Sequence, residues 1–128
     1  MQRILKPILD RKIRFALVGC GRIAKNHLSA LHELSQDCEL VDICDVESEA
    51  LRSLSRQVQV DHHKNISDML YTTTADCVIL TTPSGLHSAQ TILAAESKKH
   101  VITEKPMALN LNDGLQMLEA CKNAEVTL

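Results

Sequence analysis

A chain of 128 residues is long enough for one domain with a single hydrophobic core and too short for two. Apolar residues make up 45% and charged residues 23%, a balance typical of globular rather than disordered proteins. The net charge of −2 and the aromatic content of 2% argue against nucleic-acid binding, which uses positive fields and stacking side chains.

The first twelve residues, MQRILKPILDRK, form a leader that is too polar to be a secretory signal peptide. No apolar stretch approaches the roughly 20 residues that a membrane-spanning helix needs. The five cysteines are scattered without a CxxC pair, and their odd number favours free thiols in a reducing compartment. We therefore expect a cytoplasmic protein that binds neither membrane nor nucleic acid.

Strand-like and helix-like segments alternate along the rest of the chain. The expected strands are 13–18, 40–44, 58–60, 77–80 and 100–103. The expected helices are one from Arg22, then 47–57, a brief turn at 67–70 capped by Ser67, then 85–97 and one from about Asn112. Residues 61–63, Asp-His-His, are expected in a loop, and no metal site is expected there because no second cluster has matching ligand spacing.

Five alternations with nearly continuous apolar strands are typical of a parallel sheet covered by helices on both faces. We therefore predict an α/β fold, a doubly wound parallel sheet, over residues 13–128. Residues 125–128 resemble the first half of a sixth strand. Because native proteins rarely end inside a central strand, we expect the sequence to be truncated.

A glycine-containing turn follows the first expected strand. The segment 19–24, GCGRIA, fits the pattern G-x-G-x-x-G/A between a strand and a helix. Gly19 would permit the tight turn and Gly21 the close approach of a pyrophosphate to the backbone, while helix N–H groups face the phosphates. The candidate cofactor contacts in this turn are Gly19, Cys20, Gly21, Arg22 and Ile23.

Asp45 ends the second expected strand, where a carboxylate can accept hydrogen bonds from the adenosine ribose hydroxyls. A carboxylate there would repel a 2′-phosphate, so it favours NAD over NADP. The alternative interpretation is that Asp45 only caps the helix that follows.

Two further motifs follow the fourth and fifth strands. They are TTPSGLH at 81–87 and EKP at 104–106. Together with FALVGCGRIA at 15–24, they resemble the Gfo/Idh/MocA oxidoreductases, the glucose–fructose oxidoreductase and inositol dehydrogenase superfamily. VILTTPSGLH at 78–87 and TEKPMA at 103–108 are also similar to the branch of UDP-N-acetyl-2-amino-2-deoxyglucuronate 3-dehydrogenases, which act in bacterial surface-polysaccharide synthesis.

The resemblance implies an NAD-binding Rossmann domain followed by a C-terminal α/β domain that holds the sugar, a second catalytic group and the interface of a homo-oligomer. It implies oxidation of a sugar hydroxyl, at C3 of a UDP-N-acetyl-aminoglucuronate, with NAD as the hydride acceptor. Two alternatives are a dehydrogenase of another sugar or polyol, and a non-catalytic NAD sensor, which would have no need of a catalytic base.

The resemblance also implies roles for single residues. In relatives, the EKP lysine, here Lys105, reaches the nicotinamide ribose and the substrate hydroxyl. The residues expected along the nicotinamide side are Thr81, Thr82, Pro83, Leu86, His87, Glu104, Lys105 and Pro106.

The position of Lys105 supports this role independently, because parallel strands deliver side chains to the cleft at their carboxyl ends. A cationic nicotinamide ring in a partly dry cleft disfavours a charged ammonium, so this lysine could accept the alcohol proton. The alternative is a solvated surface lysine that pairs with Glu104.

We predict that the chain binds NAD(H) more tightly than NADP(H), because the Asp45 carboxylate would face the additional phosphate. Isothermal titration calorimetry with both reduced cofactors measures the difference. Equal or tighter binding of NADPH would remove Asp45 from this role.

Overall fold

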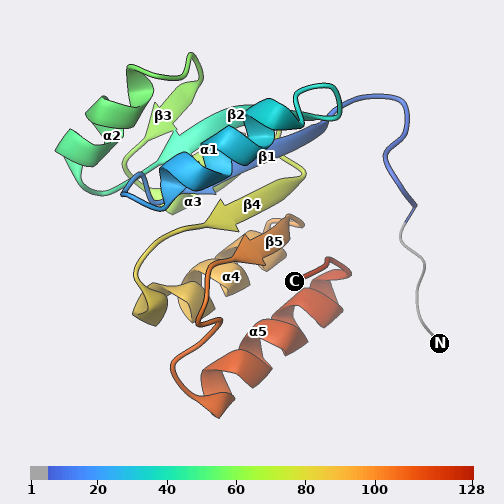
Figure 1. Cartoon of the computed structure of the whole chain (residues 1–128). Helices are drawn as coiled ribbons and strands as arrows, with labels where there is room; N and C mark the ends of the chain where they lie inside the picture. The colour runs from blue at the N-terminus through green and yellow to red at the C-terminus, as the bar shows by residue number, and fades with distance from the viewer. Residues whose placement is uncertain (1–5) are drawn as a thin grey trace.

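A computed structural model describes residues 6–128, so residues 1–5 of the expected leader lie outside the described part. The elements in chain order are β1 (Ile13–Val18), α1 (Ala24–Glu33), β2 (Cys38–Cys44), α2 (Ser48–Ser55), β3 (Asp61–His63), α3 (Ile66–Thr72), β4 (Cys77–Leu80), the 3₁₀ turn η1 (Ser84–Leu86), α4 (His87–Glu96), β5 (His100–Thr103) and α5 (Leu111–Ala124). The strands form one parallel sheet in the order β3-β2-β1-β4-β5 (Figure 1). The predicted doubly wound α/β fold is confirmed.

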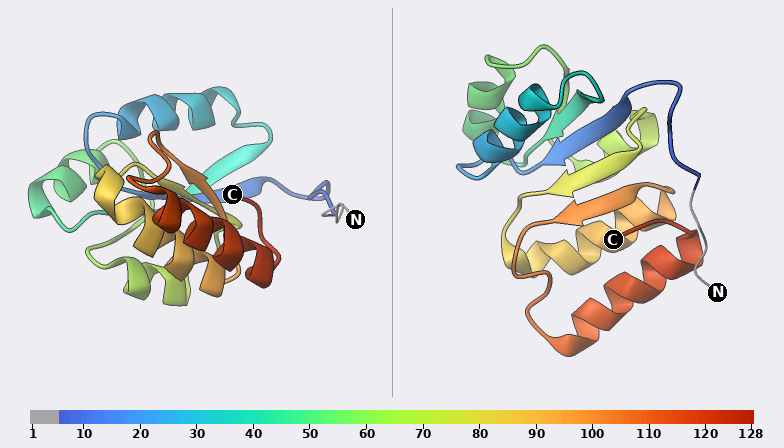
Figure 2. Two further views of the ribbon diagram at one scale, coloured as in Figure 1. Left: turned by 90° about the horizontal axis from the view of Figure 1, so that it is seen from below. Right: turned by 45° about the vertical axis from the view of Figure 1, so that its right-hand side comes forward.

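Helices cover both faces of this sheet (Figures 1 and 2). On one face, Phe15 and Leu17 of β1 pack in a core cluster with residues of α1 and α2. On the other, Ala16 and Val18 pack in a second cluster with residues of α3 and α4. Neighbouring residues of a strand point to opposite faces, so a strand between two cores must be apolar throughout. This constraint explains why β4 and the buried part of β1, residues 15–18, were recognisable as apolar runs.

The third strand differs from the prediction. Residues 58–60 form no strand, and β3 is instead Asp61–His63, which was expected to be a loop. Val58 and Val60 are partly buried against the cluster beneath α1 and α2, so their apolar character reflects packing rather than pairing. Polar β3 is tolerated because it lies at the sheet edge and pairs only with the end of β2.

Two smaller predictions also need correction. Asn65, not Ser67, caps α3, because its side chain accepts hydrogen bonds from the N–H groups of Ser67 and Asp68. Residues 125–128 form no strand. They nevertheless lie beside β5, where the Thr127 carbonyl accepts a 2.9 Å hydrogen bond from the Val101 N–H. Among residues 6–128, no helix has the length and apolar character needed to span a membrane.

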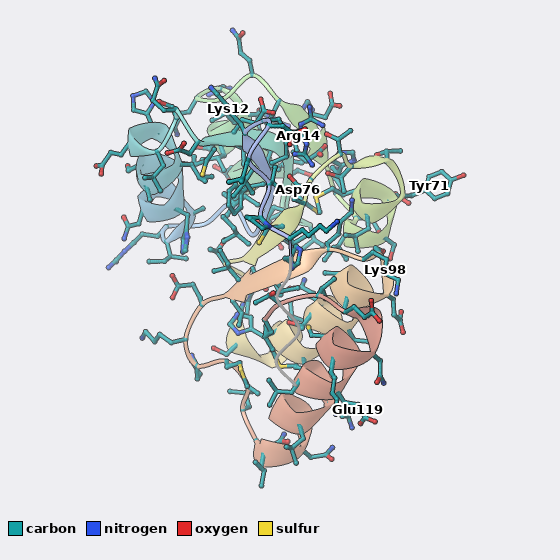
Figure 3. The ribbon with its side chains drawn as sticks, turned by 90° about the vertical axis from the view of Figure 1, so that its right-hand side faces the viewer. Lys12, Arg14, Tyr71, Asp76, Lys98 and Glu119 are labelled. Carbon is teal, nitrogen blue, oxygen red and sulfur yellow. The ribbon has the colours of Figure 1, made fainter. Side chains whose placement is uncertain are left out.

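Asp76, just before β4, joins the leader to the sheet. Its carboxylate accepts two hydrogen bonds from the Arg11 guanidinium, at 2.7 and 2.8 Å, and one from the Arg14 N–H at 2.8 Å. Figure 3 labels Asp76 and Arg14, which lie at the amino ends of β4 and β1. The hydrogen bonds from Arg11 hold the pKa of Asp76 below its ordinary value, despite the opposing effect of burial.

We predict that Asp76→Asn lowers the free energy of unfolding at pH 7. Because the pKa of Asp76 is lower in the folded chain, its stabilising effect is complete above the unfolded-state pKa. The effect is lost as the pH falls through the lower folded-state pKa. Urea unfolding of both proteins between pH 7 and pH 2 should show the difference shrinking only below about pH 4. A difference independent of pH would contradict this account.

Candidate functional site

A pocket of about 400 Å³ opens at the carboxyl edge of the sheet, where β1, β2 and β4 end. The sequence-predicted residues that line it are Gly19, Gly21, Asp45, Thr81, Thr82, Pro83 and Leu86. The lining residues that sequence reasoning missed include Val46, Glu47, Ala50, Ile66 and Gln90. Val46 and Glu47 directly follow Asp45, so their position after β2 was a usable signal, whereas Ala50 lies further on, in α2. Ile66 and Gln90 belong to α3 and α4, and which side of each helix faces the pocket depends on tertiary packing.

The two glycines of the turn serve different needs. Gly19 has a φ of +97°, and a Cβ built on it would lie 2.6 Å from the carbonyl carbon and oxygen of Thr81. The fold itself therefore requires glycine at this position. A Cβ on Gly21 would meet no atom within 4 Å, so packing does not require glycine there. Open space beside exposed backbone is what a close ligand approach needs, and the pyrophosphate role of Gly21 stays a prediction.

Helix α1 begins directly after this turn with its positive end uncompensated. Its N-cap residue, Ile23, makes no side-chain capping hydrogen bond, and the first turn carries no acidic residue. By contrast, Asn65 and Asn110 cap α3 and α5 with their side chains. An uncapped helix N-terminus favours an anion. The side chains of Arg22 and Ile23 are exposed at this position.

Asp45 connects the glycine turn to the segment after β2. One carboxylate oxygen accepts a 2.7 Å hydrogen bond from the Cys20 N–H, and the other accepts a 2.8 Å bond from the N–H of Glu47, the N-cap residue of α2. Asp45 therefore closes a turn just before α2, and it does not cap the helix, which has no side-chain capping hydrogen bond. Because Asp45 also lines the pocket, its position is compatible with the predicted contact to a ribose.

The thiol of Cys20 packs away from solvent and approaches the Cys44 carbonyl oxygen at 3.5 Å. Burial and the nearby Asp45 charge raise the pKa of Cys20 to about 12, and burial raises that of Cys44 to about 11 and that of Cys77 to about 12. A thiol rather than a thiolate is a poor nucleophile. Cys20 can therefore contribute its backbone, and not its sulfur, to the site. Cys38, at the start of β2, is only partly buried.

The segment after β4 meets the turn and the loop after β5. The Thr81 hydroxyl lies 2.6 Å from the Gly19 carbonyl oxygen, and the Thr82 hydroxyl donates to the Gln90 amide oxygen. His87 is 1% exposed, and its ring lies between the carbonyl oxygens of Thr82 and Pro106, at 2.9 and 3.0 Å. His87 therefore links two loops, and it does not line the pocket.

The EKP residues lie at the same edge of the sheet, after β5, outside the pocket lining. The Lys105 side chain is exposed and has no hydrogen bond or ion pair among residues 6–128. The peptide bond between Lys105 and Pro106 is cis. The Glu104 carboxylate contacts the ring of His27 at 2.7 Å, so the alternative pairing of Lys105 with the Glu104 side chain is not formed. His27 is partly buried.

The hydrogen bond from His27 is the main reason that the pKa of Glu104 lies below its ordinary value. Within residues 6–128, no group of three His, Cys, Asp or Glu side chains is arranged to hold a metal ion.

Comparison with known proteins places this geometry in context. The profile of the oxidoreductase family Gfo/Idh/MocA, described as having an NAD-binding Rossmann fold, matches residues 13–128. The WlbA dehydrogenase from Chromobacterium violaceum, solved with NADH and UDP-GlcNAcA, superposes with a TM-score of 0.95 at 50% identity, over 98% of this chain and 36% of that one. The WlbA dehydrogenase from Bordetella pertussis, solved with the same two ligands, gives 0.92 at 48% identity, over 94% and 36%.

A curated relative, D-apiose dehydrogenase from Paraburkholderia graminis, is 33% identical over 119 residues, which are 92% of this chain and 32% of the relative. The chain thus spans about a third of the length of these proteins.

The two glycines of the turn provide a matched pair of variants. We predict that Gly19→Ala lowers the free energy of unfolding by at least about 2 kcal/mol, because the methyl group would overlap the Thr81 backbone. Gly21→Ala should change stability by less than about 1 kcal/mol, since the space around it is open.

If Gly21 faces the phosphates, Gly21→Ala should also weaken NADH binding by at least about tenfold. Urea unfolding and NADH fluorescence titration measure the two effects. Undiminished NADH affinity of folded Gly21→Ala would move the phosphates elsewhere.

Proposed function

The chain belongs to the Gfo/Idh/MocA oxidoreductases with an NAD-binding Rossmann fold, and on that premise we propose that the protein oxidises the C3 hydroxyl of a UDP-N-acetyl-aminoglucuronate with NAD. The observation that carries the proposal is the 50% identity, over nearly the whole chain, to a dehydrogenase crystallised with NADH and UDP-GlcNAcA. A nucleotide sugar of this kind would serve surface-polysaccharide synthesis.

The residues of the pocket fit a dinucleotide. The uncapped start of α1 and the open space at Gly21 would receive the pyrophosphate. Asp45, beside them, would accept hydrogen bonds from the adenosine ribose, and the apolar side chains of Val46 and Ile66 would contact the adenine. Thr82, Pro83 and Leu86 would then lie along the nicotinamide half, toward the loop after β5.

Lys105 is the proposed base. Its side chain is exposed at the carboxyl edge of β5 and makes no hydrogen bond or ion pair within residues 6–128, so its amine is available to a substrate. As the C3 alcohol becomes a ketone, the Nζ atom would take the hydroxyl proton. Bound NAD⁺ supplies the acceptor for the hydride that leaves C3. Thr81 and His87 would keep the neighbouring loops in place through the backbone contacts described above.

We further propose that the protein acts in the cytoplasm as a homo-oligomer, with the sugar bound partly by chain beyond these residues. The five cysteines form no disulfide, which is compatible with a reducing compartment. The 33% identity to D-apiose dehydrogenase favours one competing function, oxidation of a different sugar by the same cofactor site.

A substrate panel tests the proposal. With NAD⁺ present, the complete gene product should reduce NAD⁺ to NADH with UDP-GlcNAcA and not with D-apiose or myo-inositol. The absorbance of the reduced nicotinamide measures NADH formation. Turnover of D-apiose alone would support the competing function.

In the same assay, we predict that Lys105→Met lowers kcat by at least about 100-fold, the contribution typical of a general base. The dissociation constant for NADH should stay within a few-fold, because Lys105 lies outside the pocket lining. Lys64→Met, at an exposed lysine after β3, is the control and should retain full activity. Retained turnover in Lys105→Met would assign the base to another residue.

A further inference from the structure

One hydrogen-bonded contact joins helix α1 to the loop after β5. The Nε2 atom of His27, in the first turn of α1, lies 2.7 Å from one carboxylate oxygen of Glu104. The second oxygen accepts a 3.2 Å hydrogen bond from the N–H of Lys105. The two side chains are 23% and 25% exposed, so the contact is partly shielded from water. His27 is therefore connected to the backbone of Lys105 through a single carboxylate.

The charge state of Glu104 fixes the direction of this contact. Its pKa is held below the ordinary value, chiefly by the hydrogen bond from His27, so Glu104 is a carboxylate at neutral pH. A carboxylate only accepts hydrogen bonds, so the Nε2 atom of His27 must carry the hydrogen. A neutral ring with the hydrogen on Nε2 and a doubly protonated ring both satisfy this requirement. The connection therefore persists in either charge state of His27.

A second histidine holds the other side of Lys105. The ring of His87, in the first turn of α4, contacts the carbonyl oxygen of Pro106 at 3.0 Å and that of Thr82 at 2.9 Å. Both partners are acceptors, so a ring with a single N–H donates to only one of them. Residue 104 thus lies against α1 and residue 106 against α4, and the residue between them projects into solvent.

We propose that His27 and Glu104 are a positioning pair, which sets the backbone of Lys105 relative to the start of α1. The proposal rests on the proposed function of Lys105 as the base. Glu104 acts here through its contact with α1 and not by touching the cofactor. Because α1 also begins at the glycine turn, one rigid helix relates the phosphate-binding end of the site to the reacting end.

The size of the expected effect follows from the geometry of proton transfer. A displacement of about 1 Å in a catalytic group can cost on the order of 100-fold in rate. Loss of the hydrogen bond from His27 would release the Glu104 carboxylate and, with it, the N–H of Lys105. The base would remain present but less often in position, so kcat would fall more than the affinity for either ligand.

The experiment compares His27→Leu with His32→Leu, the same change at an exposed histidine near the end of the same helix. In the present chain, hydrogen exchange of the Lys105 amide should accelerate by about tenfold in His27→Leu, the factor that corresponds to one lost hydrogen bond. It should be unchanged in His32→Leu.

In the complete gene product, His27→Leu should lower kcat by about 10- to 100-fold, with KM and the dissociation constant for NADH within about threefold. His27→Gln, whose amide can donate to Glu104, should recover most of the loss. Unchanged exchange in His27→Leu, or equal effects of His32→Leu, would overturn the proposal.

Faster exchange with unaltered kcat would also overturn the positioning role. In that case the turnover of Lys105→Met shows which of the two proposals has failed. Retained turnover in Lys105→Met shows that the proposed function of Lys105 has failed, whereas lost turnover shows that the pair is not needed to position it.

Discussion

The close passage of Gly19 against the end of β4 is the constraint on which the site depends. No side chain fits between Gly19 and the Thr81 backbone, so the turn after β1 lies directly on the neighbouring strand end. That contact determines where α1 begins, and it brings the Cys20 N–H within reach of Asp45. The floor of the pocket is therefore built from three strand ends held together by backbone. Side chains of the surrounding helices complete its walls.

The loop after β5 is held from both faces of the sheet. Helix α1 lies on one face and contacts Glu104 through His27, while α4 lies on the other and contacts Pro106 through His87. Both histidines belong to first helical turns, which lie at the same edge of the sheet as the pocket. Lys105, the proposed base, is thus exposed without being loosely placed. The amine of Lys105 is therefore accessible while the backbone on both sides of it is held by contacts to helices.

Much of the fold was predictable from sequence because strands buried on both faces carry their own signal. β1, β4 and β5 were predicted with their observed bounds. β3 was not, since an edge strand with exposed Asp61 and His62 has no apolar pattern. The residues of the candidate site were predictable to a similar extent. Asp45 and Thr81 were found because each follows a strand, whereas His27 and Glu104 are 77 residues apart, and only the packed structure brings them together.

The state of the cysteines has a practical consequence. Four of the five are buried, and the three thiols with the highest pKa values react slowly with alkylating reagents. Cys38 is the exception, and it lies at the start of β2, at the opposite end of that strand from the pocket. A fluorophore attached at Cys38 would leave the pocket clear. Cys38 is therefore the cysteine at which to test attachment for spectroscopic study.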